Sequence, residues 1–149
     1  MIAPALPGDL PAILTLEETF ARSRWSEQSW ADELGSERGH VLVERDADGA
    51  LRGVAAFTHV DGVADCHRVI VHPDHRQRGV GRRLMLAGLA WAGDLGARQM
   101  MLEVDAGNDP ARGLYDALGF LTLARRANYY GAGHDALVMA LPLTGHGHD

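Results

Sequence analysis

The chain has 149 residues, of which 46% are hydrophobic, and this length and composition predict a single domain with one core. Its apolar runs are shorter than the roughly 20 residues that cross a bilayer, and no basic region followed by an apolar one opens the sequence. We therefore expect a cytoplasmic protein that contacts no membrane. Cys66 is the only cysteine, which excludes an internal disulfide and a thiolate zinc cluster, and no metal site is expected.

The net charge of -6 is unevenly distributed. Residues 1–65 hold 5 Arg and 12 acidic residues, whereas residues 66–149 hold 9 Arg and 8 acidic residues. The acidic first half argues against direct nucleic-acid binding and favours a basic or cationic partner on that side. All 14 basic residues are Arg, which excludes the lysine of a P-loop or of a Schiff base.

Two amphipathic helices are predicted near the start, over about residues 10–21 and 27–35. Asp9 and Ser26 precede them and are the expected N-caps, because their side-chain oxygens can accept from free N–H groups of the first turn. Three strands then follow over about residues 40–46, 51–60 and 63–72. Asp48-Gly49 and Asp61-Gly62 separate them and are typical of tight hairpins, so we expect an antiparallel meander.

The second half of the chain opens with a helix from Val80 to about Leu95, where Gly96 ends it. A buried strand, a short helix and two more strands are predicted over about residues 98–104, 109–119, 120–129 and 134–142. This order of elements implies one α/β domain over residues 1–143, with a mixed, mostly antiparallel sheet and helices on both faces. The polar, glycine-rich tail 144–149 is expected to be disordered.

A candidate phosphate site precedes the long helix. Gly79 and Gly81 lie between a strand and the helix start, where absent side chains let backbone N–H groups approach an anion. Because the helix dipole disfavours cations there, the arginines that crowd this point indicate a bound polyanion. A dinucleotide fingerprint is excluded because Leu84 occupies its third glycine position. The arginines are Arg76, Arg78, Arg82 and Arg83.

The pattern Arg76-x-x-Gly79-x-Gly81 between a strand and a helix resembles that of the GNAT N-acetyltransferase superfamily. The later run Asn108-x-x-Ala111-x-x-Leu114-Tyr115-x-x-Leu118-Gly119-Phe120 agrees with the same family. Within it, the chain is most similar to the ribosomal-protein-alanine N-acetyltransferases (the RimI type), through Trp25-Ser26 and Arg126-x-Asn128-Tyr129-Tyr130. It departs from that type at Asp105-Ala106-Gly107, which leaves the acceptor open.

The resemblance implies acetyl-CoA as co-substrate, with loop amides on the pyrophosphate and the preceding strand paired with the pantetheine arm. It also implies a protein N-terminus as acceptor, such as the N-terminal alanine of a small-subunit ribosomal protein. A small-molecule amine and a non-catalytic acyl-CoA-binding module are the alternatives. The implied cofactor-binding residues are Val69, Ile70, Val71, Gln77, Arg78, Gly79, Val80, Gly81, Arg82, Asn108 and Tyr115.

Two candidate catalytic residues follow from the same resemblance. Glu103 matches the general base, although it can equally be a strand-end charge paired with an Arg. Tyr115 matches the proton donor to the leaving thiolate, although a core aromatic on an amphipathic helix is a serious alternative. Asn108 can contact coenzyme A or serve only as a helix-start residue. Three histidines near the loop could also act as a general base, namely His67, His72 and His75. In the family pattern these positions belong to the cofactor strand and its turn, so they rank below Glu103.

Overall fold

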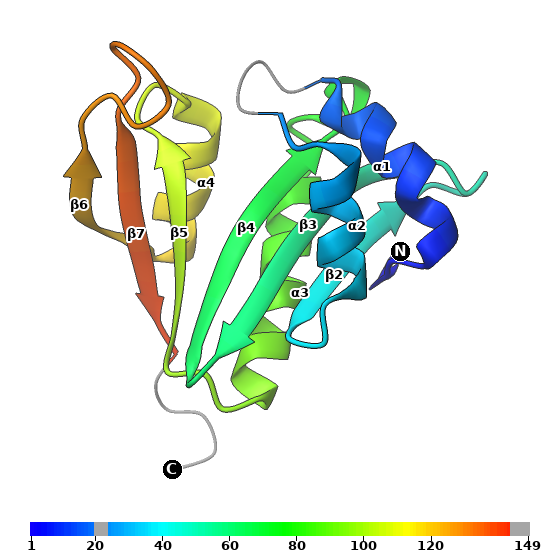
Figure 1. Ribbon diagram of the computed structural model, residues 1–149, viewed down its shortest axis with the longest axis horizontal. Coiled ribbons are helices and arrows are strands. Elements are labelled where there is room, and N and C mark those ends of the chain that lie inside the picture. The colour runs from blue at the N-terminus through cyan, green and yellow to red at the C-terminus, as the bar shows by residue number, and fades with distance from the viewer. Residues whose placement is uncertain (20–23, 144–149) are drawn as a thin grey trace.

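One mixed sheet organises the protein in the computed structural model, which describes residues 1–19 and 24–143 (Figure 1). Its strand order is β1-β2-β3-β4-β5-β7-β6. The neighbours β4 and β5 are parallel, and every other neighbouring pair of this sheet is antiparallel. The predicted α/β class, with a mixed and mostly antiparallel sheet, is thus confirmed.

The elements follow the predicted order, with one addition at the start of the chain. The strands are β1 (Ile2–Pro4), β2 (Gly39–Arg45), β3 (Leu51–Val60), β4 (Val63–Val71), β5 (Gln99–Asp105), β6 (Leu121–Arg126) and β7 (Ala136–Pro142). The helices are α1 (Leu10–Glu17), α2 (Glu27–Gly35), α3 (Val80–Asp94) and α4 (Asp109–Leu118), with 3-10 turns η1 (Pro7–Asp9) and η2 (Pro73–His75). None of the described helices is both long and apolar enough to cross a membrane.

Some predicted boundaries differ from those observed. The first helix ends at Glu17 rather than near residue 21, and β6 and β7 are shorter than the strands expected there. The strand β1 was not predicted. The last two residues of that predicted helix, together with the predicted disordered tail 144–149, lie outside the described residues.

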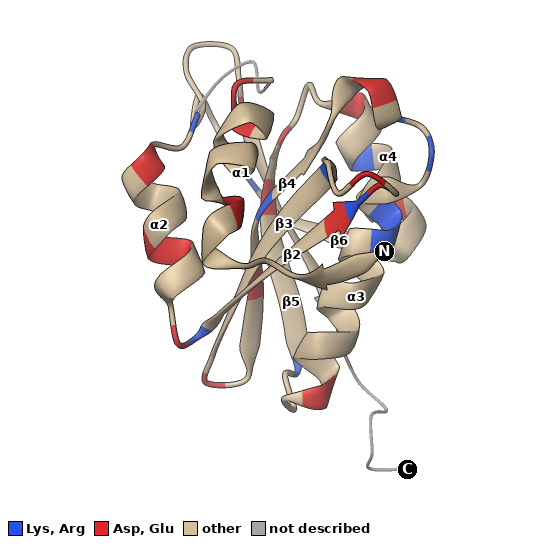
Figure 2. Cartoon of the chain, turned by 90° about the vertical axis from the view of Figure 1, so that its right-hand side faces the viewer, with Lys and Arg blue, Asp and Glu red and all other residues tan. Residues whose placement is uncertain are grey.

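The helices cover the sheet on both faces (Figure 2). Helices α1 and α2 pack on one face, where Ile13, Leu16 and Trp30 are buried against β2, β3 and β4. Helices α3 and α4 pack on the other face, where Leu84 and Tyr115 belong to a second core. Because alternate strand residues point to opposite faces, each central strand contributes to both cores.

The two predicted N-caps have different outcomes. Ser26 caps α2 as expected, since its hydroxyl accepts from Ser29 N at 3.1 Å. The prediction for Asp9 is wrong, because its side chain makes no cap bond to α1. Its carboxylate instead accepts from Leu6 N at 2.7 Å and pairs with the Arg45 guanidinium at 2.6 Å. A two-pronged guanidinium contact is stronger than a neutral cap bond, and it ties η1 to the end of β2.

The strands β4 and β5 separate halfway along their length (Figure 1). Their pairing runs from Val63–Gln99 to Cys66–Leu102 and stops there. At this point β4 contains a bulge, because Cys66 and Arg68 oppose consecutive residues of β3 and His67 is the extra residue. A bulge bends the strand that carries it, which accounts for the departure of β4 from β5. Beyond the bulge, the facing edges of the two strands are not paired with each other.

Candidate active site

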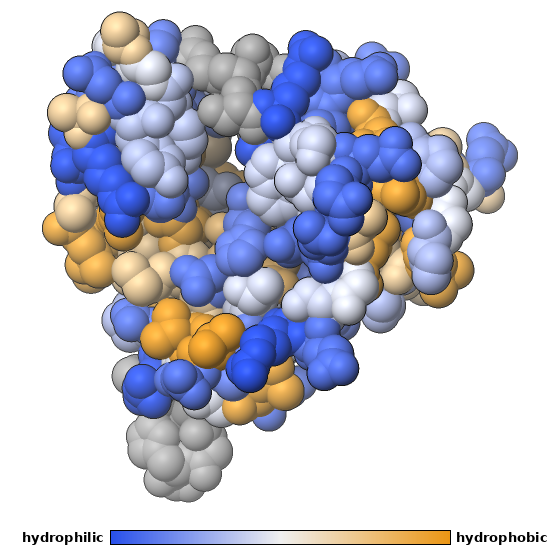
Figure 3. Space-filling view, in the orientation of Figure 1, coloured by the Kyte–Doolittle hydropathy of each residue, from blue (hydrophilic) through white to orange (hydrophobic). Residues whose placement is uncertain are grey.

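A cavity of about 980 Å³ occupies the region where β4 and β5 separate. It is lined by both strands, by the loop that leads into α3, by α4 and by the loop before β7. In the space-filling view the surface is hollowed between the part that carries α4 and β6 and the part that carries α1 and α2 (Figure 3). The cavity therefore passes through the sheet rather than lying on one face of it.

One end of the cavity is formed by the loop before α3. Gly79 is the N-cap of this helix and has a φ of +80°, a conformation that glycine adopts without strain. A Cβ added at Gly81 would lie 3.3 Å from Leu114 Cδ2 and 3.6 Å from Val71 Cγ2, so this position approaches both neighbours closely. The first N–H groups of a 15-residue helix face this end, which suits it to an anion.

The arginines around this loop have different partners. Arg82 lines the cavity, and the Arg76 Nε donates to Val71 O at 3.2 Å. Arg83 instead donates from Nε and Nη2 to the buried Glu44 carboxylate at 2.7 and 2.9 Å. This guanidinium holds the pKa of Glu44 below its usual value, and its Nη1 donates to Arg78 O at 3.0 Å. Arg83 was predicted to be one of the anion-binding cations, but its guanidinium joins the loop to Glu44 of β2.

Two predicted cofactor residues do not line the large cavity. Ile70 is 1% exposed and points into the core beneath α1 and α2. Arg78 lines a smaller pocket of about 250 Å³ that shares His75 and Val80 with the large cavity and is otherwise lined by Arg52 and Arg83. The other predicted cofactor residues all line the large cavity, and they are Val69, Val71, Gln77, Gly79, Val80, Gly81, Arg82, Asn108 and Tyr115.

Beyond the bulge, the edge of β4 that borders the cavity is not paired with β5. His72 N donates to Arg52 O of β3 at 2.8 Å, so His72 directs its N–H group toward that strand. Backbone groups alternate between the two edges of a strand, and Val69 and Val71 therefore turn theirs away from β3, toward the gap. Val71 O accepts there from Arg76 Nε at 3.2 Å. An extended molecule can pair with such an edge as an added strand does.

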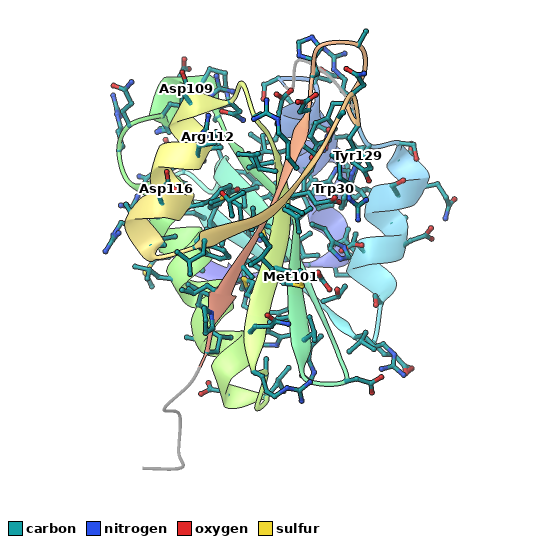
Figure 4. All side chains as sticks on the ribbon, turned by 90° about the vertical axis from the view of Figure 1, so that its left-hand side faces the viewer. Trp30, Met101, Asp109, Arg112, Asp116 and Tyr129 are labelled. Carbon is teal, nitrogen blue, oxygen red and sulfur yellow. The ribbon has the colours of Figure 1, made fainter. Side chains whose placement is uncertain are left out.

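The two candidate catalytic residues reach the cavity from opposite faces of the sheet. Leu102 and Val104 are buried beneath α3 and α4, so Glu103, between them, faces the α1 and α2 side. Tyr115 comes from α4 on the other side, whose polar residues Asp109 and Asp116 point away from the sheet (Figure 4). Both side chains line one cavity because the sheet is open at this level.

Glu103 is an ion-paired residue with access to water. Its Oε2 lies 3.3 Å from Arg126 Nε of β6, and its side chain is 32% exposed. The alternative that the sequence left open, a strand carboxylate paired with an Arg, is therefore observed, and the role of general base stays a prediction.

Tyr115 is a buried phenol. It is 7% exposed and packs edge-on against Phe120, with the ring centres 5.8 Å apart. Burial raises its pKa, and the neighbouring groups Cys66 and Tyr130 raise it further, so the hydroxyl stays protonated at neutral pH. Among the residues that the structure describes, none hydrogen-bonds this hydroxyl. Tyr115 is thus a core aromatic that borders the cavity, and its role as a proton donor stays a prediction.

Tyr130 also lines the cavity, and the sequence argument did not count it among the site residues. Burial, with Glu103 as the next contributor, raises its pKa to about 12. The loop that carries it is held by Asn128, whose N donates to Asp135 at 2.8 Å and whose Oδ1 accepts from Gly133 N at 2.9 Å. Asn128 has a φ of +56°, and the cluster of Asn and Gly residues was the available sequence signal for this turn.

Cys66 and Asn108 are two further residues of the cavity wall. Burial raises the pKa of the Cys66 thiol to about 12, which keeps it neutral and unreactive as a nucleophile. The site is therefore suited to direct transfer rather than to an acyl-cysteine intermediate. Asn108 caps α4 by accepting from Ala111 N at 3.3 Å while it lines the cavity, so the helix-start role is observed and the ligand role stays a prediction.

Together, an anion-binding helix start, an open strand edge and a carboxylate and a phenol at the point of separation have the form of a coenzyme A-dependent acyltransferase site. The chain belongs to the acetyltransferase (GNAT) family, which it matches over residues 10–120. It is accordingly an N-acetyltransferase of the class that uses acetyl-CoA, as the sequence resemblance predicted.

Relatives are found among both sequences and solved structures. The chain is 33% identical over 139 residues to the [ribosomal protein bS18]-alanine N-acetyltransferase of Salmonella typhimurium, covering 91% of this chain and 93% of that protein. The crystal structure of the ribosomal-protein-S18-alanine N-acetyltransferase from Escherichia coli superposes with a TM-score of 0.91 and 30% identity, over 100% of this chain and 97% of that one. A mycothiol acetyltransferase of Thermomonospora curvata is 38% identical over 111 residues, which are 74% of this chain and 34% of that protein.

Proposed function

We propose that this protein acetylates the N-terminal α-amine of a protein, and that its acceptor is the N-terminal alanine of ribosomal protein bS18 or a similar peptide. The observation that carries the proposal is the single cavity that Glu103, Tyr115 and the Gly79–Gly81 loop all line. The acceptor is suggested by the names of the relatives that align over nine tenths of the chain. A ribosomal acceptor implies that the enzyme works in the cytoplasm.

The residues present suit acetyl-CoA, which would supply the thioester carbonyl. The helix start at Gly79 and the cationic Arg82 would hold the pyrophosphate, because both are positive and both border the cavity. Val69 and Val71 would pair with the pantetheine arm through the backbone groups that face the gap. Asn108 borders the cavity at the start of α4 and would contact the same molecule.

Glu103 would receive the acceptor amine. A peptide α-amine titrates near about 8 and an ordinary Glu near about 4.3, so direct proton removal is uphill by roughly 3.5 units. Glu103 would therefore bind the ammonium form and pass its proton to water. The exposure of its side chain leaves a path for that water.

Tyr115 would stabilise the departing sulfur. A thiol titrates near about 8.5, below an ordinary phenol, and burial raises the pKa of Tyr115 further. Full proton transfer in the transition state is therefore unfavourable, and Tyr115 acts as a hydrogen-bond donor to the developing thiolate. Proton transfer to the thiolate would be completed as the product leaves.

A panel of acceptors tests the proposal. The protein is incubated with acetyl-CoA and with peptides that differ only in their first residue, next to polyamines and other small amines, and free coenzyme A is measured. We expect turnover to be fastest with an alanine-first peptide. Preference for a small amine over every peptide would reject the proposed acceptor and leave the acetyltransferase assignment intact.

A small-molecule amine is the second candidate acceptor. It is favoured by the alignment with a mycothiol acetyltransferase. The identity there is 38% over 74% of this chain, against 33% over 91% for the Salmonella typhimurium relative. Asp105 and His134 also line the cavity, with His134 Nδ1 3.9 Å from Asp105 Oδ2, and they place ionisable groups beside the acceptor. The same panel separates the two candidates.

A further inference from the structure

A buried carboxylate at the end of α1 organises the side of the cavity that faces α1 and α2. Glu17 is 3% exposed, and its Oε1 accepts from Trp30 Nε1 at 2.8 Å. Its Oε2 accepts from Trp25 N at 3.1 Å. Arg68 donates to it from Nε at 3.3 Å and also from Nη2. We call these four residues the Glu17 cluster.

The Glu17 cluster extends from the core to the cavity wall. Trp30 projects from α2 and is fully buried (Figure 4), whereas Arg68 lines the cavity. Trp25 lies between them, with its ring centre 4.8 Å from that of Trp30 and 5.2 Å from the Arg68 guanidinium. The Arg68 side chain is 9% exposed, so Glu17 fixes a buried cation in one orientation at the edge of the cavity.

The position of Arg68 follows from the bulge in β4. Cys66 points to the α3 and α4 core, and in a regular strand Arg68 would point the same way. The extra residue His67 reverses this parity, and Arg68 turns to α1 instead. The same bulge marks the end of pairing with β5, so the sheet opens where the guanidinium is presented.

Arg68 lies on the same side of the cavity as Glu103 and Tyr130. Its charge lowers the pKa of Tyr130, against the larger effect of burial, and the charge of Glu103 raises it, so both groups lie within electrostatic range of that phenol. Glu103 lies on the same face of the sheet as Arg68. It is the first residue of β5 beyond the last pair with β4, Cys66–Leu102. The acceptor amine, bound at Glu103, would thus lie beside the part of the cavity wall that Arg68 forms.

We propose that Glu17 is a positioning residue for acceptor binding, which acts by holding Arg68 in place at the cavity wall, with Trp25 packed against it. The inference rests on the proposed function for the location of the acceptor. A buried ion pair contributes little net stability compared with apolar residues of the same shape, which makes specificity or positioning a reason for this one to be present. The carboxylate receives donors from two tryptophans and an arginine, and a shorter or neutral side chain cannot satisfy all of them.

The test is the Glu17→Gln variant, compared with the Glu17→Gln, Arg68→Gln double variant. The single variant leaves the Arg68 charge without its carboxylate and should lower the melting temperature. We expect its KM for the acceptor to rise about tenfold, or ~1.4 kcal/mol, while the dissociation constant for acetyl-CoA stays within about twofold. The double variant should regain much of the melting temperature and keep the raised KM.

A matched control is Asp9→Asn, which breaks the ion pair with Arg45 at the start of α1, away from the cavity. It should lower the melting temperature and leave both constants unchanged. Wild-type acceptor KM in the single variant, or recovery of that KM in the double variant, would overturn the inference. The assay uses whichever amine the wild type acetylates, so failure of the alanine peptide would count against the proposed acceptor only.

Discussion

The two ends of the cavity are built in different ways. The end at α3 is made by a short continuous stretch, residues 76–82, in which backbone groups and glycine conformation form the site. The end at Glu103 is made by side chains from β4, β5, α4 and the loop before β7, and α1 supports it through Glu17. The comparison indicates that a backbone site is encoded locally, whereas a side-chain site depends on how distant elements pack.

The largest effect is expected at the backbone end. Gly81→Asp would place a carboxylate beside the helix start, where an anion should bind, and its Cβ already meets Leu114 and Val71. We expect no measurable coenzyme A binding by calorimetry. Gly113→Asp on α4 is the control, because a Cβ there meets nothing within 4 Å, and it should bind normally. An unchanged dissociation constant in folded Gly81→Asp would remove the phosphate site.

At the other end, Glu103→Gln should lower kcat by about 10²–10⁴ and leave acetyl-CoA affinity largely unchanged. If Glu103 relays the ammonium proton, the variant should recover activity as the pH rises past about 8, because solvent then supplies the neutral amine. A pH–rate profile on the alanine-first peptide measures this. Wild-type kcat at neutral pH would make Glu103 only the partner of Arg126.

Tyr115→Phe should lower kcat by a similar factor of about 10²–10⁴, without recovery at high pH. Its defect lies at the leaving sulfur, and a raised pH does not replace a hydrogen-bond donor. A thioester with a more acidic thiol should restore the rate, which single-turnover measurements with two thioesters would detect. Equal losses with both thioesters would leave Tyr115 as a core aromatic, and circular dichroism checks that the variant folds.

A smaller effect is expected for Arg82→Ala. Loss of one cation beside the phosphates should weaken coenzyme A binding about tenfold and leave binding of its dephosphopantetheine fragment nearly unchanged. Arg98→Ala, at the paired end of the strands, is the control and should change neither constant. Equal losses of affinity for both ligands in Arg82→Ala would indicate a folding defect rather than the loss of a phosphate contact.

The smallest expected effect is on stability and concerns His67, the additional residue of the bulge in β4. Its Nδ1 lies 3.2 Å from Glu33 Oε2 and its Nε2 3.0 Å from Thr58 Oγ1. The hydrogen bond to Glu33 raises the pKa of His67, with burial opposing and Asp65 adding. A raised folded-state pKa stabilises the protein fully below about pH 6.5, and this contribution is lost as the pH rises through the folded value.

Denaturant unfolding of His67→Gln and wild type should therefore differ by about 0.5–1 kcal/mol more at pH 6 than at pH 9, a range reduced for a partly exposed pair. Glu33→Gln should remove the same pH dependence. A difference that grows toward high pH would contradict the assigned shift.

Sequence predicted the parts of the molecule that depend on neighbouring residues. The element order, the hairpins and the loop at Gly79 follow from periodicity and turn chemistry, and they agree with the structure. The three-residue strand β1 was too short for a periodic signal. The ion pair of Arg83 with Glu44 joins residues 39 positions apart, and that of Arg68 with Glu17 joins residues 51 positions apart. No local sequence pattern predicts such contacts.

One distant feature did leave a trace in the sequence. Along β4 the residues that face the α3 and α4 core fall at even positions, Ala64 and Cys66, and then at odd positions, Val69 and Val71. An alternation that changes parity within one strand indicates an extra residue. The bulge could have been predicted from it, but the carboxylates that receive His67 and Arg68 could not.

The separation of β4 and β5 also has a consequence for how the protein opens. The backbone ladder between β1–β4 and β5–β7 consists of the pairs from Val63–Gln99 to Cys66–Leu102. Amide hydrogens of β5 and β7 should exchange with solvent through a subglobal opening that leaves β2 and β3 protected. A molecule paired with both facing edges would extend this ladder and slow exchange in the smaller part by mass action. Bound substrate would then join the two parts of the sheet, so that they unfold together.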